Sequence, residues 1–600
     1  METPPDQGQP RPDQPEESIG GLGVQLNMMF RAFLASPERN RLLFLSVLVF
    51  VIILATAYGQ VQLNAWNQPF YNALADRNLP EFLNQLIVFL VIAGILLALN
   101  VTQTWLNLTI KLRLREGLVQ DLLAEWMKPR RAFRLANAGS IGVNPDQRLH
   151  EDARHLTELS TDLGIGLLQS SILLVSFIGV LWNISSGFAF QFGPRSISIP
   201  GYMVWAAAFY AATASLISLW VGRPLVGYNA SRYAREAEFR FSLVRASEHA
   251  DAISLNGGEK DAERHLNGDL QAVLAAMARL VTAVTRLQWV TSGYGWFTLV
   301  APILVAAPVY FAGNLSFGGM MVAVGAFNQV QGALRWFVDN FNSIADWRAT
   351  LLRVANFRHA MVRLDKLDQV EKQIAFADAP GGNLVLENLE INAPTGRLRL
   401  SETEVEVRPG ERILVVGETG ADKALLFRAI AGLWPWGSGK VAMPAGQSVT
   451  FMPRRPYFPP GTLRETLSYP LAPSTFAEGD FVSALQQLRL DHLIPSLDRK
   501  ARWDKELEED EQQCLAFARL PLHKPAWILI DEALETLDDD ARRRIVEIFS
   551  DALAASAIIN IGRQEVQNQV FTRVLHLTRE AGGETPPDPF YDFLSLGHGI

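Results

Sequence analysis

Long apolar runs constrain this chain more than any other feature of its sequence. A helix needs about 20 predominantly apolar residues to cross the hydrocarbon core of a bilayer. Five runs in the first half of the chain approach or reach that length, and a sixth is weaker. They span residues 42–57, 83–101, 164–182, 202–221, 289–311 and 318–338. The sequence therefore predicts six membrane-spanning helices.

The sixth run differs from the others because it carries polar side chains. It contains Asn328, Gln329, Gln331 and Arg335, so we expect it to face a polar cavity or other protein rather than lipid. The composition agrees with a membrane protein, since only 19% of the residues are charged, whereas a soluble chain has roughly a quarter. A net charge of −8 argues against nucleic-acid binding. The single cysteine, Cys514, excludes an intramolecular disulfide and any cysteine-rich metal site, and we expect no metal site.

Basic residues cluster after the second and fourth runs, which predicts the orientation. They are Lys111, Arg113, Arg115, Lys128, Arg130, Arg131 and Arg134 after the second run, and Arg223, Arg232, Arg235, Arg240 and Arg245 after the fourth. Positive charge is retained on the cytoplasmic side, so both termini are predicted to be cytoplasmic. The first run starts too far from the N-terminus for a cleavable signal, which favours a retained anchor.

The composition changes after the last run, which predicts a second domain. Residues 1–30 are predicted to be disordered, residues 31–360 to form the six-span domain, and residues 361–383 to form a charged linker. In residues 384–580, short apolar runs such as 412–416 and 527–530 alternate with helix-like stretches, which is the α/β pattern. Residues 581–600 are predicted to be a C-terminal tail.

One motif in the second domain approaches the phosphate-binding loop G-x-x-x-x-G-K-[ST], which lies between a strand and a helix. The loop here supplies Gly417, Gly420 and Lys423, but Asp422 replaces the second glycine of the motif and Ala424 replaces the hydroxyl residue. Further along, an apolar strand ends in Asp531 and Glu532. This arrangement is typical of a metal-binding aspartate followed by a glutamate that polarises the attacking water.

Several stretches together resemble fused ABC half-transporters of the SbmA/BacA-like type, which are related to the peroxisomal D-subfamily half-transporters. The stretches are residues 236–259, 326–349, 431–435, 455–457 and 511–519. The resemblance implies a polytopic α-helical membrane domain of six transmembrane helices, ABC-exporter-like, followed by an α/β ABC-type nucleotide-binding domain. It also implies a multi-pass protein of the bacterial inner membrane with a cytoplasmic nucleotide domain.

The departures from the family motifs predict a nucleotide domain that does not hydrolyse ATP. Residues 507–511 read Leu-Glu-Glu-Asp-Glu where the family signature is Leu-Ser-Gly-Gly-Glu. Arg454 stands where the family has a glutamine, and Arg563 where it has the switch histidine. On the resemblance, Glu532 is then a vestigial catalytic residue, and Gly417, Gly420, Lys423 and Asp531 form a vestigial nucleotide site. We expect Mg²⁺ and ATP to bind weakly and no cofactor to be required.

A transporter without ATP hydrolysis needs another energy source, and protons are the candidate that the resemblance suggests. Glu236 and Glu238 on the cytoplasmic extension of the fourth span, with Asp339 and Asp346 near the end of the sixth, are the candidate coupling residues. The alternative is that such acids pair with arginines at helical spacing.

Three function classes remain open. The first is an SbmA/BacA-like transporter of peptides or other bulky hydrophilic solutes such as cobalamin, and the resemblance implies that it is an importer. The second is an ordinary ATP-driven ABC transporter that retains ATP binding, and the third is a non-transporting membrane scaffold or regulator. For each we expect a homodimer surrounded by membrane lipid, because the polar sixth span would otherwise face lipid, and no nucleic-acid partner.

Overall fold

The computed structural model describes residues 23, 38–136, 145–186, 189–192, 195–363, 373–379, 381–393, 396–417, 422–562 and 570–580. The chain divides into two compact units. The helical unit comprises Met1–Ala124 and Asn144–Phe357, and the sheet unit comprises Glu125–Val143 and Arg358–Ile600. Gly23 apart, the predicted disordered segment 1–30 and the tail 581–600 lie outside the described residues.

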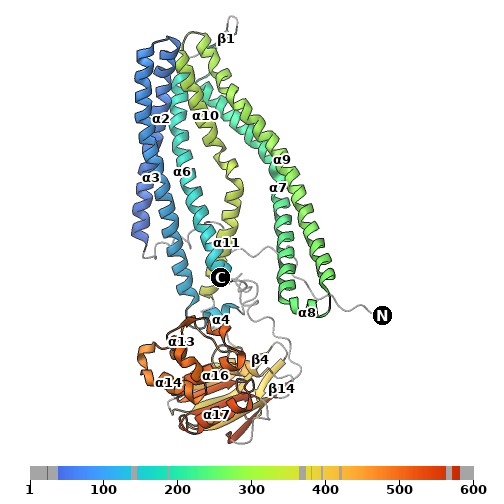
Figure 1. Ribbon diagram of the computed structural model, residues 1–600. Coiled ribbons are helices and arrows are strands. Elements are labelled where there is room, and N and C mark those ends of the chain that lie inside the picture. The colour runs from blue at the N-terminus through green and yellow to red at the C-terminus, as the bar shows by residue number, and fades with distance from the viewer. Residues whose placement is uncertain are drawn as a thin grey trace, which may run out of the picture. The chain divides into compact units, whose positions relative to one another are not determined.

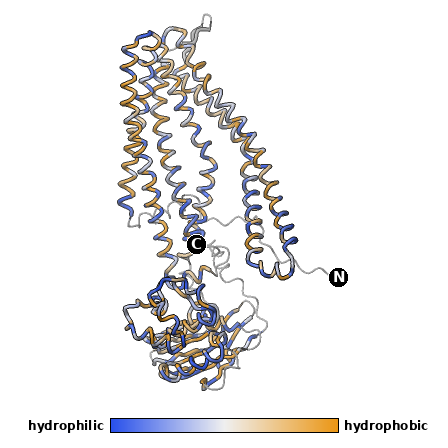
Figure 2. Tube along the Cα trace, viewed as in Figure 1, coloured by the Kyte–Doolittle hydropathy of each residue, from blue (hydrophilic) through white to orange (hydrophobic). Residues whose placement is uncertain are grey.

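Long helices make up the helical unit (Figure 1). They are α2 (Arg39–Ala75), α3 (Leu79–Trp126), α6 (Ala153–Ser185), α7 (Tyr202–Glu248), α9 (Glu259–Phe311), α10 (Phe317–Asp339) and α11 (Phe341–Arg363). In the described residues, five helices are long and apolar enough to span a membrane: α2, α3, the helix Pro145–Ser185 that includes α6, α7 and α9. Figure 2 shows apolar residues running along them. The predicted sixth span is present as α10, although it is less apolar than these five.

Helices α7 and α9 lie side by side and are much longer than a bilayer requires (Figure 1). They have 47 and 53 residues, and at 1.5 Å per residue each measures about 70–80 Å against a hydrocarbon core of about 30 Å. The short helix α8 (Ala250–Leu255) lies between them in sequence. The length of α7 therefore agrees with the cytoplasmic extension expected for the fourth span.

Polar side chains of α2 contact the backbone of α10, the predicted sixth span. The side-chain amide of Asn64 donates to the carbonyl of Val322 at 3.1 Å, and the N–H of Gly318 donates to the side chain of Asn72 at 2.9 Å. A Cβ on Gly318 would come within 2.1 Å of the carbonyl oxygen of Gln68, so glycine permits the close approach of α10 to α2. Much of α10 is thus buried against protein.

A single mixed sheet organises the sheet unit. In the described residues it has ten strands in the order β3-β8-β4-β5-β14-β7-β13-β12-β9, with β6 paired to β4. They are β3 (Ala375–Ala379), β4 (Leu384–Ala393), β5 (Gly396–Leu400), β6 (Glu404–Val407), β7 (Arg412–Gly417), β8 (Gly437–Pro444), β9 (Val449–Met452), β12 (Trp527–Asp531), β13 (Ala557–Gly562) and β14 (Arg573–Glu580). Strands β14, β7, β13, β12 and β9 pair in parallel, which brings the carboxyl ends of β7, β12 and β13 to one edge.

Helices pack against this sheet around a large apolar core. They are α12 (Lys423–Ile430), α13 (Leu463–Ser468), α14 (Glu478–Gln487), α16 (Glu509–His523) and α17 (Asp539–Ser550). The core includes Phe481, Trp503, Phe517 and Phe549, each at most 1% exposed. The α/β architecture predicted for this part of the chain is therefore confirmed, as is a helical membrane domain before it.

The linker expected at residues 361–383 differs from what the structure shows. Helix α11 continues to Arg363, and β3 occupies Ala375–Ala379 and pairs in parallel with β8. Four of the five residues of β3 are exposed, so this edge strand lacks the apolar signal that marks the central strands. Residues 364–372 lie outside the described residues.

A short helix between the second and third spans belongs to the sheet unit. It is α4 (Arg131–Ala136), and the guanidinium of the preceding Arg130 lies 5.9 Å from the ring centroid of Phe376. The same guanidinium approaches Gly432, where an added Cβ would come within 2.7 Å of it. Gly432 has a φ of +69°, so both the space and the backbone require glycine there.

Candidate functional site

The candidate site lies at the carboxyl ends of the parallel strands β7, β12 and β13. Gly417 ends β7, and α12 begins at Lys423 with Asp422 at its N-cap position. The side chain of Asp422 makes no capping hydrogen bond. Gly420 lies in the loop 418–421, which is outside the described residues, as is Arg563. The structure thus brings Gly417, Asp422, Lys423, Asp531 and Glu532 to the same edge of the sheet.

Lys423 and Glu532 form an ion pair across this edge. The ammonium nitrogen Nζ of Lys423 lies 2.8 Å from Oε1 of Glu532 and donates to the carbonyl of Gly562 at 3.3 Å. The second carboxylate oxygen, Oε2, lies 3.7 Å from Nη1 of Arg454. The carboxylate predicted to polarise water is therefore in contact with the lysine predicted to hold a phosphate.

Asp531 lies in a site that disfavours its charge. Burial, followed by the neighbouring carboxylates Glu532 and Asp422, raises its pKa to about 6, although Arg428 and Lys423 act in the opposite direction. A carboxyl group with such a pKa is still mainly ionised at pH 7. Ala424, on the first turn of α12, supplies no hydroxyl oxygen to this site.

Arg454, predicted to stand where the family has a glutamine, is anchored through its backbone rather than its side chain. Its carbonyl accepts a hydrogen bond from the side-chain amide of Gln513, a buried residue of α16. Its side chain is 66% exposed and contacts Glu532 only at the 3.7 Å distance given above. An exposed ion pair of that length contributes little to stability.

Residues 507–511, predicted to correspond to the family signature, lead into the start of α16. Glu508 is at the N-cap position, and Glu509, Asp510 and Glu511 occupy the first turn. Glu511 lies 3.0 Å from Nε2 of His492, whereas Glu508, Glu509 and Asp510 are exposed. Carboxylates are favourable at a helix N-terminus because they face the positive end of the helix dipole. Their negative charges therefore compensate the positive end of the helix dipole, which would otherwise attract an external anion.

The four candidate coupling residues lie in two kinds of environment. Glu236, Glu238 and Asp339 each pair with an arginine of their own helix: Arg232 at 3.7 Å, Arg235 at 2.7 Å and Arg335 at 3.3 Å. This is the alternative raised by the sequence, because the partners lie three or four residues away. Asp346 of α11 differs, since its Oδ2 lies 2.6 Å from Nε2 of His155 on α6.

The sequence did not reveal a buried charge cluster near the same helices. Asp152 is 4% exposed and contacts Arg353 of α11 at 2.8 Å and Arg148 at 2.6 Å. It lies in a π-helical turn, Arg148–Asp152, that leads into α6. The four-residue spacing of Arg148 and Asp152 was the only available signal, and it resembles an ordinary surface pair.

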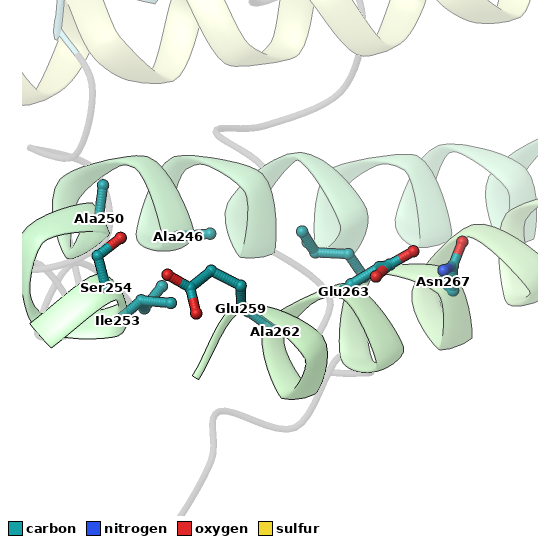
Figure 3. A pocket seen from close by; sticks show the side chains of 9 residues that line it. Ala246, Ala250, Ile253, Ser254, Glu259, Ala262, Glu263 and Asn267 are labelled. Atoms are coloured by element: carbon teal, nitrogen blue, oxygen red, sulfur yellow. The ribbon is translucent and has the colours of Figure 1, made fainter. Parts of the chain in front are cut away.

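A surface pocket of about 440 Å³ lies between the ends of α7 and α9 and the short helix α8 (Figure 3). Its lining residues are mainly small or apolar, with two carboxylates: Ala246, Ala250, Ile253, Ser254, Glu259, Ala262, Glu263, Leu266 and Asn267. None of these is a predicted site residue. Those from Ala246 to Glu259 lie in the stretch 236–259 that resembles the family.

Comparison with protein families assigns both parts of the chain. Residues 29–311 match the family described as ABC transporter transmembrane region 2, and residues 400–535 match the family described as ABC transporter. The first match covers the spans up to α9, and the second begins at the end of β5 and ends just after Glu532.

Relatives align over most of this chain. It is 27% identical over 527 residues to the inner membrane ABC transporter ATP-binding protein YddA of Escherichia coli K12, an alignment that covers 86% of this chain and 92% of the relative. It is 26% identical over 637 residues to the chloroplastic ABC transporter D family member 2 of Arabidopsis thaliana, covering 95% and 88%. It is 24% identical over 589 residues to the human lysosomal cobalamin transporter ABCD4, covering 90% and 92%.

Proposed function

Because the chain is a fused ABC half-transporter related to the D subfamily, we propose that it transports solutes across the bacterial inner membrane without hydrolysing ATP. The proposed class is SbmA/BacA-like, and the proposed direction is import. The proposed solutes are peptides or other bulky hydrophilic molecules, for which the cobalamin transporter among its relatives is a precedent.

The residues at the carboxyl ends of β7 and β12 carry the ATP-independent part of this proposal, because they do not fit Mg²⁺-bound ATP. Ala424 has no hydroxyl for the metal, and Lys423 is paired with Glu532. Asp422 places a carboxylate where backbone amides should approach phosphate. At about 5 Å and an effective dielectric constant of 20, one such charge pair costs roughly 3 kcal/mol.

Pairing with a competent partner would not restore ATP hydrolysis. By resemblance, each ATP site combines the phosphate loop of one subunit with the signature of the other. This chain departs from the family in both, at Asp422 and Ala424 and again at residues 507–511. A homodimer is the proposed assembly, because the polar sixth span would otherwise face lipid, and mass measurement in a native-like bilayer should give the mass of two chains.

Proton coupling is the proposed energy source. Asp346 is the strongest candidate because its partner is His155 rather than an arginine, and histidine is the side chain that changes charge near neutral pH. Glu236, Glu238 and Asp339 remain candidates, and each contacts an arginine of its own helix.

The ordinary ATP-driven transporter is the second candidate, since Lys423, Asp531 and Glu532 are all present at the expected edge of the sheet. Uptake of a labelled peptide into proteoliposomes separates the candidates. We expect uptake to follow an imposed pH gradient and to stop with an uncoupler, with or without ATP. Uptake that requires ATP supports the second candidate, and no uptake under any condition supports the scaffold.

A further inference from the structure

The lysine of the phosphate loop already holds an anion that belongs to the protein itself. Its ammonium nitrogen lies 2.8 Å from Oε1 of Glu532 and 3.3 Å from the carbonyl oxygen of Gly562. The other oxygen of the same carboxylate faces Arg454 at 3.7 Å. One carboxylate therefore bridges the two cationic side chains nearest to it, as an oxyanion of phosphate would.

The backbone fixes the carboxylate in this place. Glu532 has a φ of +51°, which is unusual for a residue other than glycine. Its N–H donates to the carbonyl of Ile561 at 2.9 Å, which extends the pairing of β12 with β13 by one bond. The side chains of Lys423 and Glu532 are only 16% and 24% exposed. The pair is thus partly shielded from water and positioned by the sheet.

Carboxylates outnumber cations in the described part of the site. Asp422 raises and Arg428 lowers the pKa of Asp531, the last residue of β12. The cations are Lys423, Arg428 and Arg454, and the carboxylates are Asp422, Asp531, Glu532 and Glu535, whose side chain approaches Gly562. An incoming phosphate would meet these carboxylates and would have to displace Glu532 from Lys423.

We infer that Glu532 is the resident anion of the phosphate site, a built-in carboxylate that occupies Lys423 and keeps the domain independent of nucleotide. This inference rests on the proposed function and deepens it. It assigns Glu532 a role in closing the site to phosphate, instead of the water-polarising role that the motif predicts.

Calorimetric titration of inorganic pyrophosphate, without Mg²⁺ and with the full-length protein in lipid nanodiscs, tests this inference. Glu532→Ala should bind pyrophosphate at least tenfold more tightly than the unmodified protein, because Lys423 becomes available. The matched control is Glu535→Ala, which removes a carboxylate three residues further along the chain that also approaches Gly562. Because the titration contains no metal, pyrophosphate is not hydrolysed, and a gain in affinity cannot come from slower hydrolysis.

Two further variants complete the test. Lys423→Ala combined with Glu532→Ala should lose the gain, since the freed lysine is its source. Glu532→Gln keeps the size of the side chain and removes only the charge, so it replaces Glu532→Ala if that variant does not fold. Equal gains in the Glu532 and Glu535 variants, or no gain in either Glu532 variant, would overturn the inference. The proposed function is tested separately, by ATP turnover of the unmodified protein.

Discussion

Two guanidinium nitrogen atoms of Arg353 on α11 donate hydrogen bonds to the carboxylate of Asp152, which directly precedes α6. Nη2 lies 2.8 Å from Oδ1 of Asp152, and Nε lies 3.2 Å from both carboxylate oxygens. Arg148 contacts the same carboxylate from the π-helical turn at 2.6 Å. Since Asp152 is 4% exposed, this contact joins two segments of the helical unit through a buried charge.

Asp152→Asn should destabilise the helical unit, because it leaves Arg148 and Arg353 without a buried counter-charge. The expected loss is at most about 3 kcal/mol, since the arginines remain partly exposed. The control is Glu151→Gln, which removes an exposed partner of Arg154 and should cost less than about 1 kcal/mol. Thermal unfolding in nanodiscs compares the two. Equal losses would mean that the buried cluster has no special role.

Asp346→Asn should remove most of the dependence of peptide uptake on the pH gradient. Its contact with His155 joins α6 to α11, whereas the other candidate coupling residues each contact an arginine of their own helix. Glu158→Gln serves as the control, because Glu158 is not a candidate coupling residue and pairs with Arg154 of its own helix. Unchanged gradient dependence in Asp346→Asn, with a normal amount of dimer, would argue against this coupling site.

Restoring the phosphate-loop motif should increase ATP affinity without restoring hydrolysis. Asp422→Gly combined with Ala424→Ser removes a carboxylate worth roughly 3 kcal/mol of repulsion, so affinity should rise by up to about a hundredfold. Asp422→Glu keeps the charge and is the control. Turnover should stay absent because the acidic residues 508–511 are unchanged. Calorimetry with Mg²⁺-ATP measures the first effect, and tight binding by the unmodified protein would refute it.

His523 should make the sheet unit less stable as the pH falls below about 6.5. Burial lowers its pKa, Arg519 acts in the same direction, and a hydrogen bond with the carbonyl of Leu467 opposes both. The folded state therefore favours neutral histidine, so the unfolded state takes up the proton first and unfolding becomes easier. His523→Gln should flatten this acid-side loss in thermal unfolding between pH 7 and pH 5, while an unchanged slope would show that other groups cause it.

The sequence predicted the elements that depend on apolar patterns. Five spans, the strands around 412–416 and 527–530, and the approach of Lys423 to the end of β12 all follow from runs or motifs of known spacing. The edge strand β3 was not predicted, because it is mostly exposed and lacks that apolar pattern. The contact of Asp152 with Arg353 was not predicted either. The two residues are 201 positions apart, and no local pattern encodes such a pairing.

The geometry of the candidate site needed the structure as well. The sequence showed that Asp422 and Ala424 depart from the motif, but it could not show that Glu532 contacts Lys423. Likewise, it could not tell which acids have arginine partners and which one faces His155. Such contacts depend on how strands and helices pack, not on the spacing of residues along the chain.

Mg²⁺-dependent release of phosphate from ATP by the purified protein in nanodiscs, with and without peptide, tests the central claim most directly. We predict a rate equal to that of the Lys423→Ala variant, both with peptide and without it. A rate that depends on Mg²⁺, rises with peptide and disappears in Lys423→Ala would contradict transport without ATP hydrolysis.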